Sequence, residues 1–424
     1  MTNLFDELQW RGLVSEATES LADAFANERV TGYIGFDPTA SSLHVGSLLT
    51  VMGIARLQRF GHSPIAIVGG GTGMIGDPSG KSQERQLLSR EQIDENVAGI
   101  RRQLERFLDF DRAGNPARIV NNADWLASFD LLGFLRDTGK HFTVNYMLQK
   151  ESVNRRLESE EGISYTEFSY LLLQARDFLE LFDRYGCTLQ MGGSDQWGNI
   201  TAGIELVRKL RGARAHGLVW PLMTTASGTK FGKTEAGTIW LDATRTLPFR
   251  FYQFWLNTDD RDVVAYLKSF TFLDRDAIGA LEDATRTAPE KREAQRVLAR
   301  EVTAAVHGGD QVARAEHASS LLFAEDITTL TVDEVLAVFD DVPSTELSAD
   351  ALAGAGIGVG DLVARVQLAP SKAEARRLVQ SGGIYVNNRR VADPQARLTR
   401  ADAIDGRLFV VRKGAKLNHV VRLT

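Results

Sequence analysis

Short apolar runs alternate with amphipathic stretches through the first half of the chain. Residues 30–36 and 64–70 form apolar runs that predict strands, and residues 43–60 between them carry apolar positions at helical spacing. The same order of strand and then helix returns at 187–191 and 197–212. Because this alternation is typical of a parallel sheet covered by helices, the first part of the chain is predicted to be an α/β domain.

The pattern changes beyond residue 246, where the predicted α/β domain ends. Between residues 247 and 340 the strand signals fade and apolar positions recur at helical spacing, which predicts a mostly helical second domain. Residues 341–359 are rich in Pro, Ser, Ala and Gly and are interpreted as a linker, although part of this segment could form a short helix or lie packed. Residues 360–424 suffice for one small further module.

The composition is that of an ordinary globular protein. The 424 residues are 43% hydrophobic and 25% charged, which excludes collagen, coiled-coil rods and disordered tails. The single cysteine, Cys187, excludes an internal disulfide framework, and a reducing cytoplasm fits best. No stretch approaches the roughly 20 apolar residues of a membrane span, and the first residues lack the basic start and apolar run of a secretory signal. We therefore expect a cytoplasmic protein without a membrane partner.

The net charge of −6 is unevenly distributed along the chain. Residues 360–424 hold 13 Lys plus Arg against 5 Asp plus Glu, a balance of +8, whereas the first 359 residues carry a balance of −14. A basic module attached to an acidic body indicates contact with a polyanion such as nucleic acid, or simply a solvated basic surface.

The segment around the first predicted strand contains candidate chemistry. Tyr33, Gly35 and Asp37 share one face, because alternate side chains of a strand point the same way. His44 and Ser47 fall in the first turn of the next helix, where backbone amides and the helix dipole favour an anion. The imidazole could donate a hydrogen bond to a phosphate there, or it could be an ordinary first-turn histidine.

The long helix predicted at 167–182 carries a polar stripe. Tyr170, Gln174 and Asp177 are spaced i, i+4 and i+7, so they lie on one face of an otherwise apolar helix. Such a stripe either faces solvent or lines a pocket, and the pattern taken alone favours solvent.

Two glycine-rich segments lie close to predicted strand ends. Residues 68–82 include Asp77, but they contain neither a P-loop in register nor a dinucleotide fingerprint, so both phosphate-loop interpretations are rejected. In the second segment, Asp195 and Gln196 lie between a strand and a helix, at the usual ligand edge of a parallel sheet. They could bind a polar substrate or form only a turn and helix cap.

A third glycine-rich segment, residues 228–237, is a loop that holds Lys230 and Lys233. Two lysines three residues apart on a glycine-rich loop suit a triphosphate that must be gripped and then released as pyrophosphate. Taken alone, the segment favours a solvated loop of lysines.

Together these segments resemble the bacterial tyrosyl-tRNA synthetases, which are class I aminoacyl-tRNA synthetases, and the resemblance runs through almost the whole chain. PTASSLHVGS at 38–47 is similar to the HIGH motif and KFGKT at 230–234 to the KMSKS motif. YIGFDPTA, GDPSGK, YLLLQARD and GGSDQWGNI match the family's tyrosine-specific surroundings. Two departures are Ser47, where the HIGH motif often has its second histidine, and Ile34, where some relatives have cysteine.

The resemblance implies a Rossmann-like catalytic domain at 1–246, a helical anticodon-side domain at 247–340 and an S-four-type α+β RNA-binding module at 360–424. It implies a tyrosine–tRNA ligase that joins L-tyrosine to ATP, giving tyrosyl-adenylate and pyrophosphate, and then to tRNA(Tyr). ATP is a substrate accompanied by Mg²⁺, for which no protein ligand set is visible, and no tightly bound cofactor is implied. The family is homodimeric.

The resemblance also assigns residues to roles. Those implied in catalysis at the phosphates are Thr39, His44, Lys230 and Lys233. Those implied in tyrosine binding are Tyr33, Asp77, Tyr170, Gln174 and Asp177. Those implied in ATP or adenylate binding are Gly35, Asp37, Gly46, Ser47, Gly193, Asp195, Gln196 and Lys233. Those implied in RNA binding are Lys372, Arg376, Arg377, Arg389 and Arg390.

Two other functions compete with this interpretation. A tryptophan-specific class I synthetase is disfavoured by Tyr33 and Asp177, because an indole offers no hydroxyl for them to bind. An RNA-binding protein that kept the fold and lost catalysis is disfavoured by the presence of His44 and both loop lysines.

Overall fold

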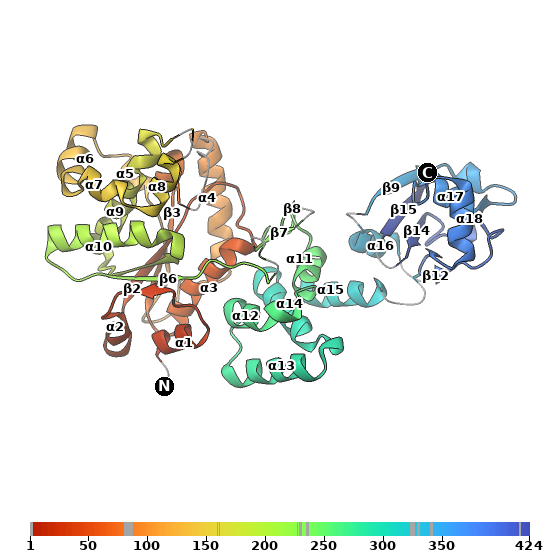
Figure 1. Ribbon diagram of the computed structural model, residues 1–424, viewed down its shortest axis with the longest axis horizontal. Coiled ribbons are helices and arrows are strands. Elements are labelled where there is room, and N and C mark those ends of the chain that lie inside the picture. Colours follow the sequence, from red (N-terminus) through yellow and green to blue (C-terminus); the bar gives the residue numbers. More distant parts are fainter. Residues whose placement is uncertain are drawn as a thin grey trace. The chain divides into compact units, whose positions relative to one another are not determined.

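The computed structural model describes residues 3–79, 88–158, 160, 162–226, 228, 231–234, 237–322, 327–328, 331–339, 342–414 and 417–424. The chain divides into two compact units (Figure 1): the first holds Met1–Leu247 and Phe254–Val306, and the second holds Pro248–Gln253 and His307–Thr424. No helix among the described residues is both long and apolar enough to cross a membrane.

A six-stranded sheet forms the centre of the first unit. Its strands lie in the order β1-β6-β5-β2-β3-β4, and every neighbouring pair is parallel except β1 with β6. β2 (Thr31–Phe36) and β3 (Ser63–Val68) are mostly buried, as expected of parallel strands covered on both faces. The other strands are β1 (Glu16–Ala17), β4 (Arg118–Asn121), β5 (Leu189–Gly193) and β6 (His216–Trp220).

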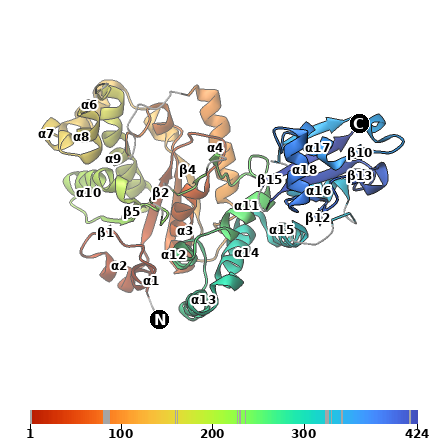
Figure 2. The same cartoon turned by 45° about the vertical axis from the view of Figure 1, so that its right-hand side comes forward.

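Helices cover both faces of this sheet. α9 (Tyr165–Tyr185) and α10 (Trp197–Arg211) lie on one face, and α3 (Val45–Arg59) and α4 (Arg90–Leu104) lie on the other (Figures 1 and 2). The predicted parallel sheet covered by helices is therefore confirmed. The shorter helices of this part of the chain are α1 (Leu4–Trp10), α2 (Leu21–Asn27), α5 (Ala123–Leu126), α6 (Leu131–Asp137), α7 (Val144–Leu148) and α8 (Glu151–Leu157).

β2 is the strand at which the strand order reverses. The chain passes from β2 through α3 to β3 on one side, whereas β5, on the other side of β2, leads through α10 to β6. Open α/β sheets bind ligands in a crevice at such a point, so a ligand crevice is expected beyond the carboxyl ends of β2 and β5. The motifs at 31–47 and 189–200 both end at this edge of the sheet.

Helices dominate the described residues from 248 to 339, as the spacing of apolar positions predicts. They are α11 (Pro248–Leu256), α12 (Asp260–Phe270), α13 (Arg275–Thr287), α14 (Glu293–His307), α15 (Gly309–Leu322) and α16 (Val332–Phe339). α12, α13 and residues 293–306 of α14 belong to the same compact unit as the six-stranded sheet.

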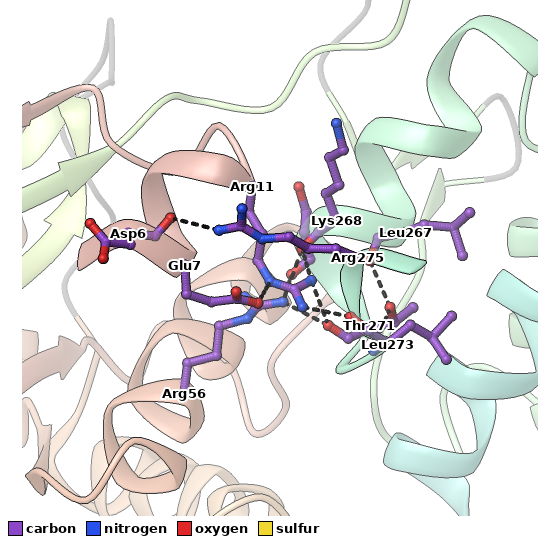
Figure 3. Close-up of polar contacts among 10 residues, drawn as sticks. Asp6, Glu7, Arg11, Arg56, Leu267, Lys268, Thr271, Leu273 and Arg275 are labelled. Atoms are coloured by element: carbon purple, nitrogen blue, oxygen red, sulfur yellow. Dashed lines mark hydrogen bonds and ion pairs between the residues drawn. The ribbon is translucent and has the colours of Figure 1, made fainter. Parts of the chain in front are cut away.

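Two buried arginines join the beginning of the chain to the end of α12 (Figure 3). Arg56 on α3 donates through Nη2 to the carbonyls of Ser269 and Thr271, each at 2.8 Å. Arg11, just after α1, donates to the carbonyls of Lys268 and Leu273, each at 2.7 Å. The last carbonyls of a helix have no partner within it, so the two guanidinium groups supply the donors that the end of α12 lacks. Burial, together with a smaller effect of the neighbouring Arg11, lowers the pKa of Arg56 to about 9.

A smaller sheet and two helices form the main core of the second unit. Its strands lie in the order β12-β11-β14-β15-β9. α17 (Val359–Arg365) and α18 (Lys372–Gln380) contribute to its main core with β11 and β14. The strands are β9 (Ser344–Leu347), β11 (Ile384–Val386), β12 (Arg389–Arg390), β14 (Leu408–Lys413) and β15 (Leu417–Leu423), with a separate pair of β10 (Ile357–Gly358) and β13 (Arg397–Leu398).

The segment interpreted as a linker, 341–359, is packed over much of its described length. Its β9 pairs in parallel with β15, and its β10 pairs with β13. Of the alternatives that the composition leaves open, the packed arrangement therefore applies from Ser344 onward, and this segment is part of the second unit.

Candidate active site

The polar stripe of α9 faces the interior of the protein. Tyr170 is 5% exposed and Asp177 is 3% exposed, so the solvent-facing arrangement favoured by the pattern alone is wrong for these two residues. The remaining faces of α9 pack on the hydrophobic core through residues such as Leu171 and Phe178. The stripe therefore points to the crevice at the carboxyl edge of the sheet.

Asp177 is a buried carboxylate whose two oxygens each accept a hydrogen bond. Trp125 Nε1 donates to Oδ1 at 2.7 Å, and Asn122 Nδ2 donates to Oδ2 at 2.9 Å. Burial raises the pKa of Asp177 to about 7, although these two donors act in the opposite direction by favouring the charged form. The result is a carboxyl group that is held in place and is close to its titration point at neutral pH.

Tyr33 places a phenol next to this carboxylate. Its side chain is 1% exposed, and its ring meets that of Phe178 edge to face, with centroids 5.3 Å apart. Burial raises the pKa of Tyr33 well above its ordinary value, and the charge of Asp177 adds to this effect. Its hydroxyl has no hydrogen-bond partner among the described residues. A buried polar group without a partner costs stability, so its presence needs a functional explanation.

Asp37, at the carboxyl end of β2, connects Tyr170 to the Asp177 cluster. Tyr170 Oη donates to Asp37 Oδ2 and Thr72 Oγ1 donates to Asp37 Oδ1, both at 2.8 Å. Asn122 in turn donates to Thr72 Oγ1 at 2.9 Å. One continuous network thus joins side chains from β2, α9 and the loops after β3 and β4.

A second network surrounds Asp77. Gln196 Nε2 donates to Asp77 Oδ2 at 2.8 Å, and Gln174 Nε2 donates to Gln196 Oε1 at 3.2 Å. Asn199 on α10 donates to Gln174 Oε1 at 2.9 Å. The amides of Gln174 and Gln196 are thereby oriented around a carboxylate that is 8% exposed, an arrangement that suits a small cation such as an ammonium group.

The structure adds residues that sequence reasoning missed. Thr72, Asn122, Trp125 and Asn199 complete the two networks, and all four are buried. Asn122 and Trp125 follow β4, so the rule that ligand groups follow the carboxyl ends of parallel strands could have found them. The glycine run also has a specific use: a Cβ on Gly69 would lie 2.3 Å from Asp37 Oδ1.

His44 is the N-cap residue of α3 and is exposed at the same edge of the sheet. Its ring lies over Gly46, because a Cβ at position 46 would lie 2.7 Å from His44 Cε1. The amide of Ser47, which is half-buried, donates to the His44 carbonyl at 2.8 Å. The start of the helix therefore presents an exposed imidazole at this edge of the sheet, where the amides of Val45 and Ser47 already donate to the carbonyls of Ile239 and His44.

The other predicted nucleotide contacts lie at the carboxyl ends of β2 and β5. Gly35 and Thr39 are exposed, and a Cβ on Gly35 would meet nothing within 4 Å. Gly193 and Asp195 are half-buried, and a Cβ on Gly193 would lie 2.7 Å from Asp195 Oδ1. The backbone of Gly35 is therefore open to the approach of a ligand.

The lysine loop lies against the start of α3. Gly232 has φ +81°, which favours glycine, and a Cβ there would lie 2.8 Å from Val45 Cγ2 and 3.3 Å from the Gly46 amide nitrogen. Lys233 begins β7 (Lys233–Thr234), which pairs with β8 (Gly237–Thr238). Lys230 lies outside the described residues. The structure therefore brings the backbone of the lysine loop to the His44 motif, two segments almost 190 residues apart.

The predicted RNA contacts lie in the second unit and are all exposed. Lys372 forms an ion pair with Asp361 at 2.9 Å, and Arg377 forms a longer one with Glu374 at 3.7 Å. Arg390 Nε donates to the Gly382 carbonyl at 3.1 Å, so this arginine also supports a turn. Arg376 and Arg389 complete the predicted set. Surface ion pairs of this kind are weak, so they leave the cations available to a polyanion.

Comparisons with known proteins agree across the whole chain. The family described as "tRNA synthetases class I (W and Y)" matches residues 26–324, and the "Tyrosine--tRNA ligase SYY-like C-terminal domain" matches residues 334–421. The tyrosine–tRNA ligase of Roseiflexus castenholzii is 56% identical over 423 residues, which cover 100% of both chains. That of Geobacillus stearothermophilus is 54% identical over 423 residues, which cover 99% of each.

Solved structures agree with these sequence matches. A C-terminally truncated mitochondrial tyrosyl-tRNA synthetase of Aspergillus nidulans superposes with a TM-score of 0.70 at 31% identity, covering 76% of this chain and 95% of that one. A tryptophanyl-tRNA synthetase of Encephalitozoon cuniculi shares the fold. It superposes with a TM-score of 0.53 at 14% identity, covering 79% of this chain and 90% of that one.

Proposed function

The chain belongs to the class I tyrosyl-tRNA synthetases, and we propose that the crevice of its six-stranded sheet is where L-tyrosine reacts with ATP before passing to tRNA(Tyr). The observation that carries this proposal is the buried hydroxyl of Tyr33, which has no partner among the described residues and lies near the Asp177 carboxylate. A phenolic ligand offers a hydrogen-bond partner to both side chains, because its hydroxyl donates to the Asp177 carboxylate and accepts from the Tyr33 hydroxyl.

The rest of the amino acid is bound at the second network. The α-ammonium group of tyrosine carries three donors, and Asp77, Gln174 and Tyr170 offer oxygen acceptors. A charged acceptor such as Asp77 contributes the most, since hydrogen bonds to charged groups are worth about 1.5–3 kcal/mol. Phenylalanine would leave Tyr33 and Asp177 without their ligand contact, so the pocket selects against it by burying polar groups without partners.

The chemistry then needs positioning and charge stabilisation. The carboxylate of tyrosine is itself the nucleophile and attacks the α-phosphate of ATP, so pyrophosphate leaves without an enzyme base. Negative charge that develops on the phosphates is met by donors already in place, which is the main way such a site can lower the barrier. We assign this role to Thr39 after β2, to His44 at the start of α3, and to Lys230 and Lys233 on the loop.

The nucleotide occupies the outer part of the crevice. Gly35, Gly46 and Gly193 allow close approach of the backbone, while polar groups nearby orient the ribose and the adenylate. We assign the latter role to Asp37, Ser47, Asp195 and Gln196. ATP enters with Mg²⁺ bound to its phosphates, because this small ion binds substrate phosphates readily.

The second unit is proposed to bind the RNA. Its exposed cations are suited to phosphates, and residues 360–424 carry the +8 balance. We also keep the predicted division into a catalytic domain at 1–246, a helical domain at 247–340 and an RNA-binding module at 360–424 as part of this proposal. The aminoacylation of tRNA takes place in the cytoplasm of bacteria, and we place this chain there.

ATP–pyrophosphate exchange with each amino acid in turn tests the proposed function. Exchange that depends on tyrosine alone is the expected result. Exchange with tryptophan would instead indicate the related specificity, and a complete lack of exchange would favour an RNA-binding protein without catalysis.

Replacing Tyr33 by phenylalanine should relax the discrimination against phenylalanine as a substrate. The change removes one hydroxyl and keeps the ring that packs on Phe178. A neutral hydrogen bond is worth roughly 0.5–1.5 kcal/mol, which corresponds to a two- to twelvefold change. The ratio of kcat/KM for tyrosine and phenylalanine, measured by pyrophosphate exchange, checks this. An unchanged ratio would show that the phenol of the substrate does not contact Tyr33.

A homodimer is part of the proposal and has a candidate surface in the first unit. Leu131 and Leu132 on α6 are 70% and 76% exposed, Val144 on α7 is 60% exposed, and Tyr165 at the start of α9 is 73% exposed. α6 and α7 lie next to each other in both views (Figures 1 and 2). Large exposed apolar side chains on neighbouring elements are typical of a surface that a partner covers, and we assign it to a second copy.

Replacing Leu132 by aspartate should therefore convert the dimer to a monomer. In a symmetric interface the substitution occurs twice, so two unpaired charges would be buried. Sedimentation velocity at micromolar concentration measures the outcome, and Leu417→Asp, at an exposed leucine of the second unit, is the matched control. A dimer that persists in Leu132→Asp would place the interface elsewhere.

A further inference from the structure

The segment that follows the lysine loop is fastened to the start of α3 by backbone hydrogen bonds. Val45 N donates to the Ile239 carbonyl at 3.0 Å, and Leu241 N donates to the Leu43 carbonyl at 2.9 Å. His44 and Trp240 are the pair of residues between these two bonds, in an antiparallel bridge. Because the bonds use only backbone atoms, the position of residue 240 opposite His44 is fixed whatever side chain it carries.

The side chains of this pair are also in contact. The rings of His44 and Trp240 meet edge to face, with centroids 6.0 Å apart and planes inclined by 69°. This is a favoured geometry for two aromatic rings. The imidazole also lies over Gly46, where a Cβ would come within 2.9 Å of Nδ1. An exposed histidine is thus held by a ring and by the backbone at the start of α3.

The ring of Trp240 is itself held in place. The guanidinium carbon of Arg245 lies 3.4 Å from the centroid of the Trp240 ring, a stacked cation–π contact. The amide of Trp240 donates to Thr246 Oγ1 at 3.0 Å. The turn between these residues is closed by Thr244, which donates through its amide and its hydroxyl to Asp242 Oδ1, both at 2.8 Å. Arg245 is thus stacked on Trp240, whose ring in turn meets that of His44 edge to face.

We propose that Trp240 is a positioning residue for His44 and that Arg245 fixes the ring of Trp240. The inference rests on the proposed function, in which His44 donates a hydrogen bond to the phosphates of ATP. Trp240 acts through the histidine: its ring restricts the imidazole to the rotamer that points a nitrogen at the start of α3. A donor that is already in place loses no orientation in the transition state, whereas a displacement of about 1 Å can cost roughly 100-fold in rate.

Trp240→Leu is the test, because it removes the ring and keeps the backbone bonds and an apolar side chain. The rate constant of tyrosyl-adenylate formation should fall by about 10- to 100-fold, while the dissociation constant of tyrosine stays unchanged. Trp240→Phe retains a ring face and should recover most of the rate. The matched control is Trp10→Leu on α1, far from His44 in sequence. It removes another tryptophan whose ring is covered by an arginine, Arg275. The rate constant of this variant should equal that of the wild type.

A double-mutant cycle with His44→Ala separates positioning from general packing. In the His44→Ala background, Trp240→Leu should cause no further loss, because the group that it positions is gone. Equal losses in both backgrounds, or a parallel loss of tyrosine affinity and melting temperature, would overturn the inference while leaving the proposed function intact. No exchange with tyrosine by the wild-type protein would overturn the proposed function and this inference together.

Discussion

Replacing Asp177 by asparagine is expected to lower kcat/KM for tyrosine activation by roughly 10- to 150-fold. The carboxylate is the charged acceptor for the phenol of the substrate, and such a bond is worth about 1.5–3 kcal/mol. The amide of asparagine also lowers stability, because its NH₂ group must face Asn122 Nδ2 or Trp125 Nε1, both of which are donors. One buried donor is then left without an acceptor in the free and the bound enzyme alike, at a cost of about 1–3 kcal/mol of folding free energy.

Pyrophosphate exchange with tyrosine measures this loss, and Asp183→Asn is the matched control. Asp183 lies on the same helix but forms a surface ion pair with Arg211, so its substitution should leave activation unchanged. Comparable activity in Asp177→Asn and the wild type would mean that the phenol of tyrosine binds elsewhere.

The stability of the ligand-free protein gives a second readout on the same variant. The pKa of Asp177 is raised to about 7 from an ordinary value of 3.8, so between these pH values the folded protein binds more protons than the unfolded chain. Stability therefore falls as pH rises through this range, and Asp177→Asn lacks this fall. The difference in free energy of unfolding, variant minus wild type, should therefore increase by up to about 4 kcal/mol between pH 4 and pH 8. Urea denaturation of both proteins at the two pH values measures this difference.

Ending the chain after Leu322 is expected to keep tyrosyl-adenylate formation and to reduce the charging of tRNA by roughly 100-fold or more. The six-stranded sheet and every side chain assigned to tyrosine or ATP precede this point. The removed residues include the whole basic module, and phosphate contacts supply much of the affinity for nucleic acid. The residual charging should depend less steeply on salt, since each lost phosphate contact lowers the slope by about 1.

The structure also decides where the chain should be cut. A linker interpretation of 341–359 places the cut near Ala355, but this leaves β9 without β15 and removes the partners of α16. Val335 and Phe339 of α16 pack in a cluster with Leu408 and Val420 of the sheet. A chain that ends at Ala355 should therefore expose apolar surface and aggregate, whereas one that ends at Leu322 lacks α16 together with the sheet on which it packs.

Exchange, charging and melting temperature measured on the Leu322 truncation distinguish two roles of the second unit. Retained exchange with lost charging supports RNA binding. If the truncated protein melts earlier and loses both reactions together, the second unit is needed for stability and its role as an RNA-binding module would have to be abandoned.

The sequence predicts the central strands of the first unit because their signals are local. The runs at 30–36 and 64–70 are long, apolar and followed by helices, and they become β2 and β3. The second unit is harder, because β9 pairs with a strand more than 70 residues later and its four residues carry no strong apolar pattern. Local composition cannot reveal a partner at that separation.

The candidate site is predictable to the extent that residue spacing determines it. The spacing of Tyr170 and Asp177 places both on one face of α9, but only the packing of that helix on the sheet decides that the face is buried. Asn122 and Trp125 were missed because β4 is only four residues long and half-buried, so its apolar pattern is too weak to prompt the rule about strand ends. Their importance comes from Asp177, which lies more than 50 residues further along the chain.

The two buried arginines at the end of α12 have a consequence for how the protein is made. Arg56 lies 215 residues before Thr271, one of the carbonyls to which it donates. On a ribosome that adds roughly 5–20 residues per second, at least 10 seconds separate the synthesis of the two. Until α12 emerges, the guanidinium of Arg56 cannot be buried against its acceptors. The side of α3 that carries it therefore stays exposed in the nascent chain, where water or a chaperone must cover it. Completion of the catalytic fold therefore waits for residues that contribute no side chain to the site.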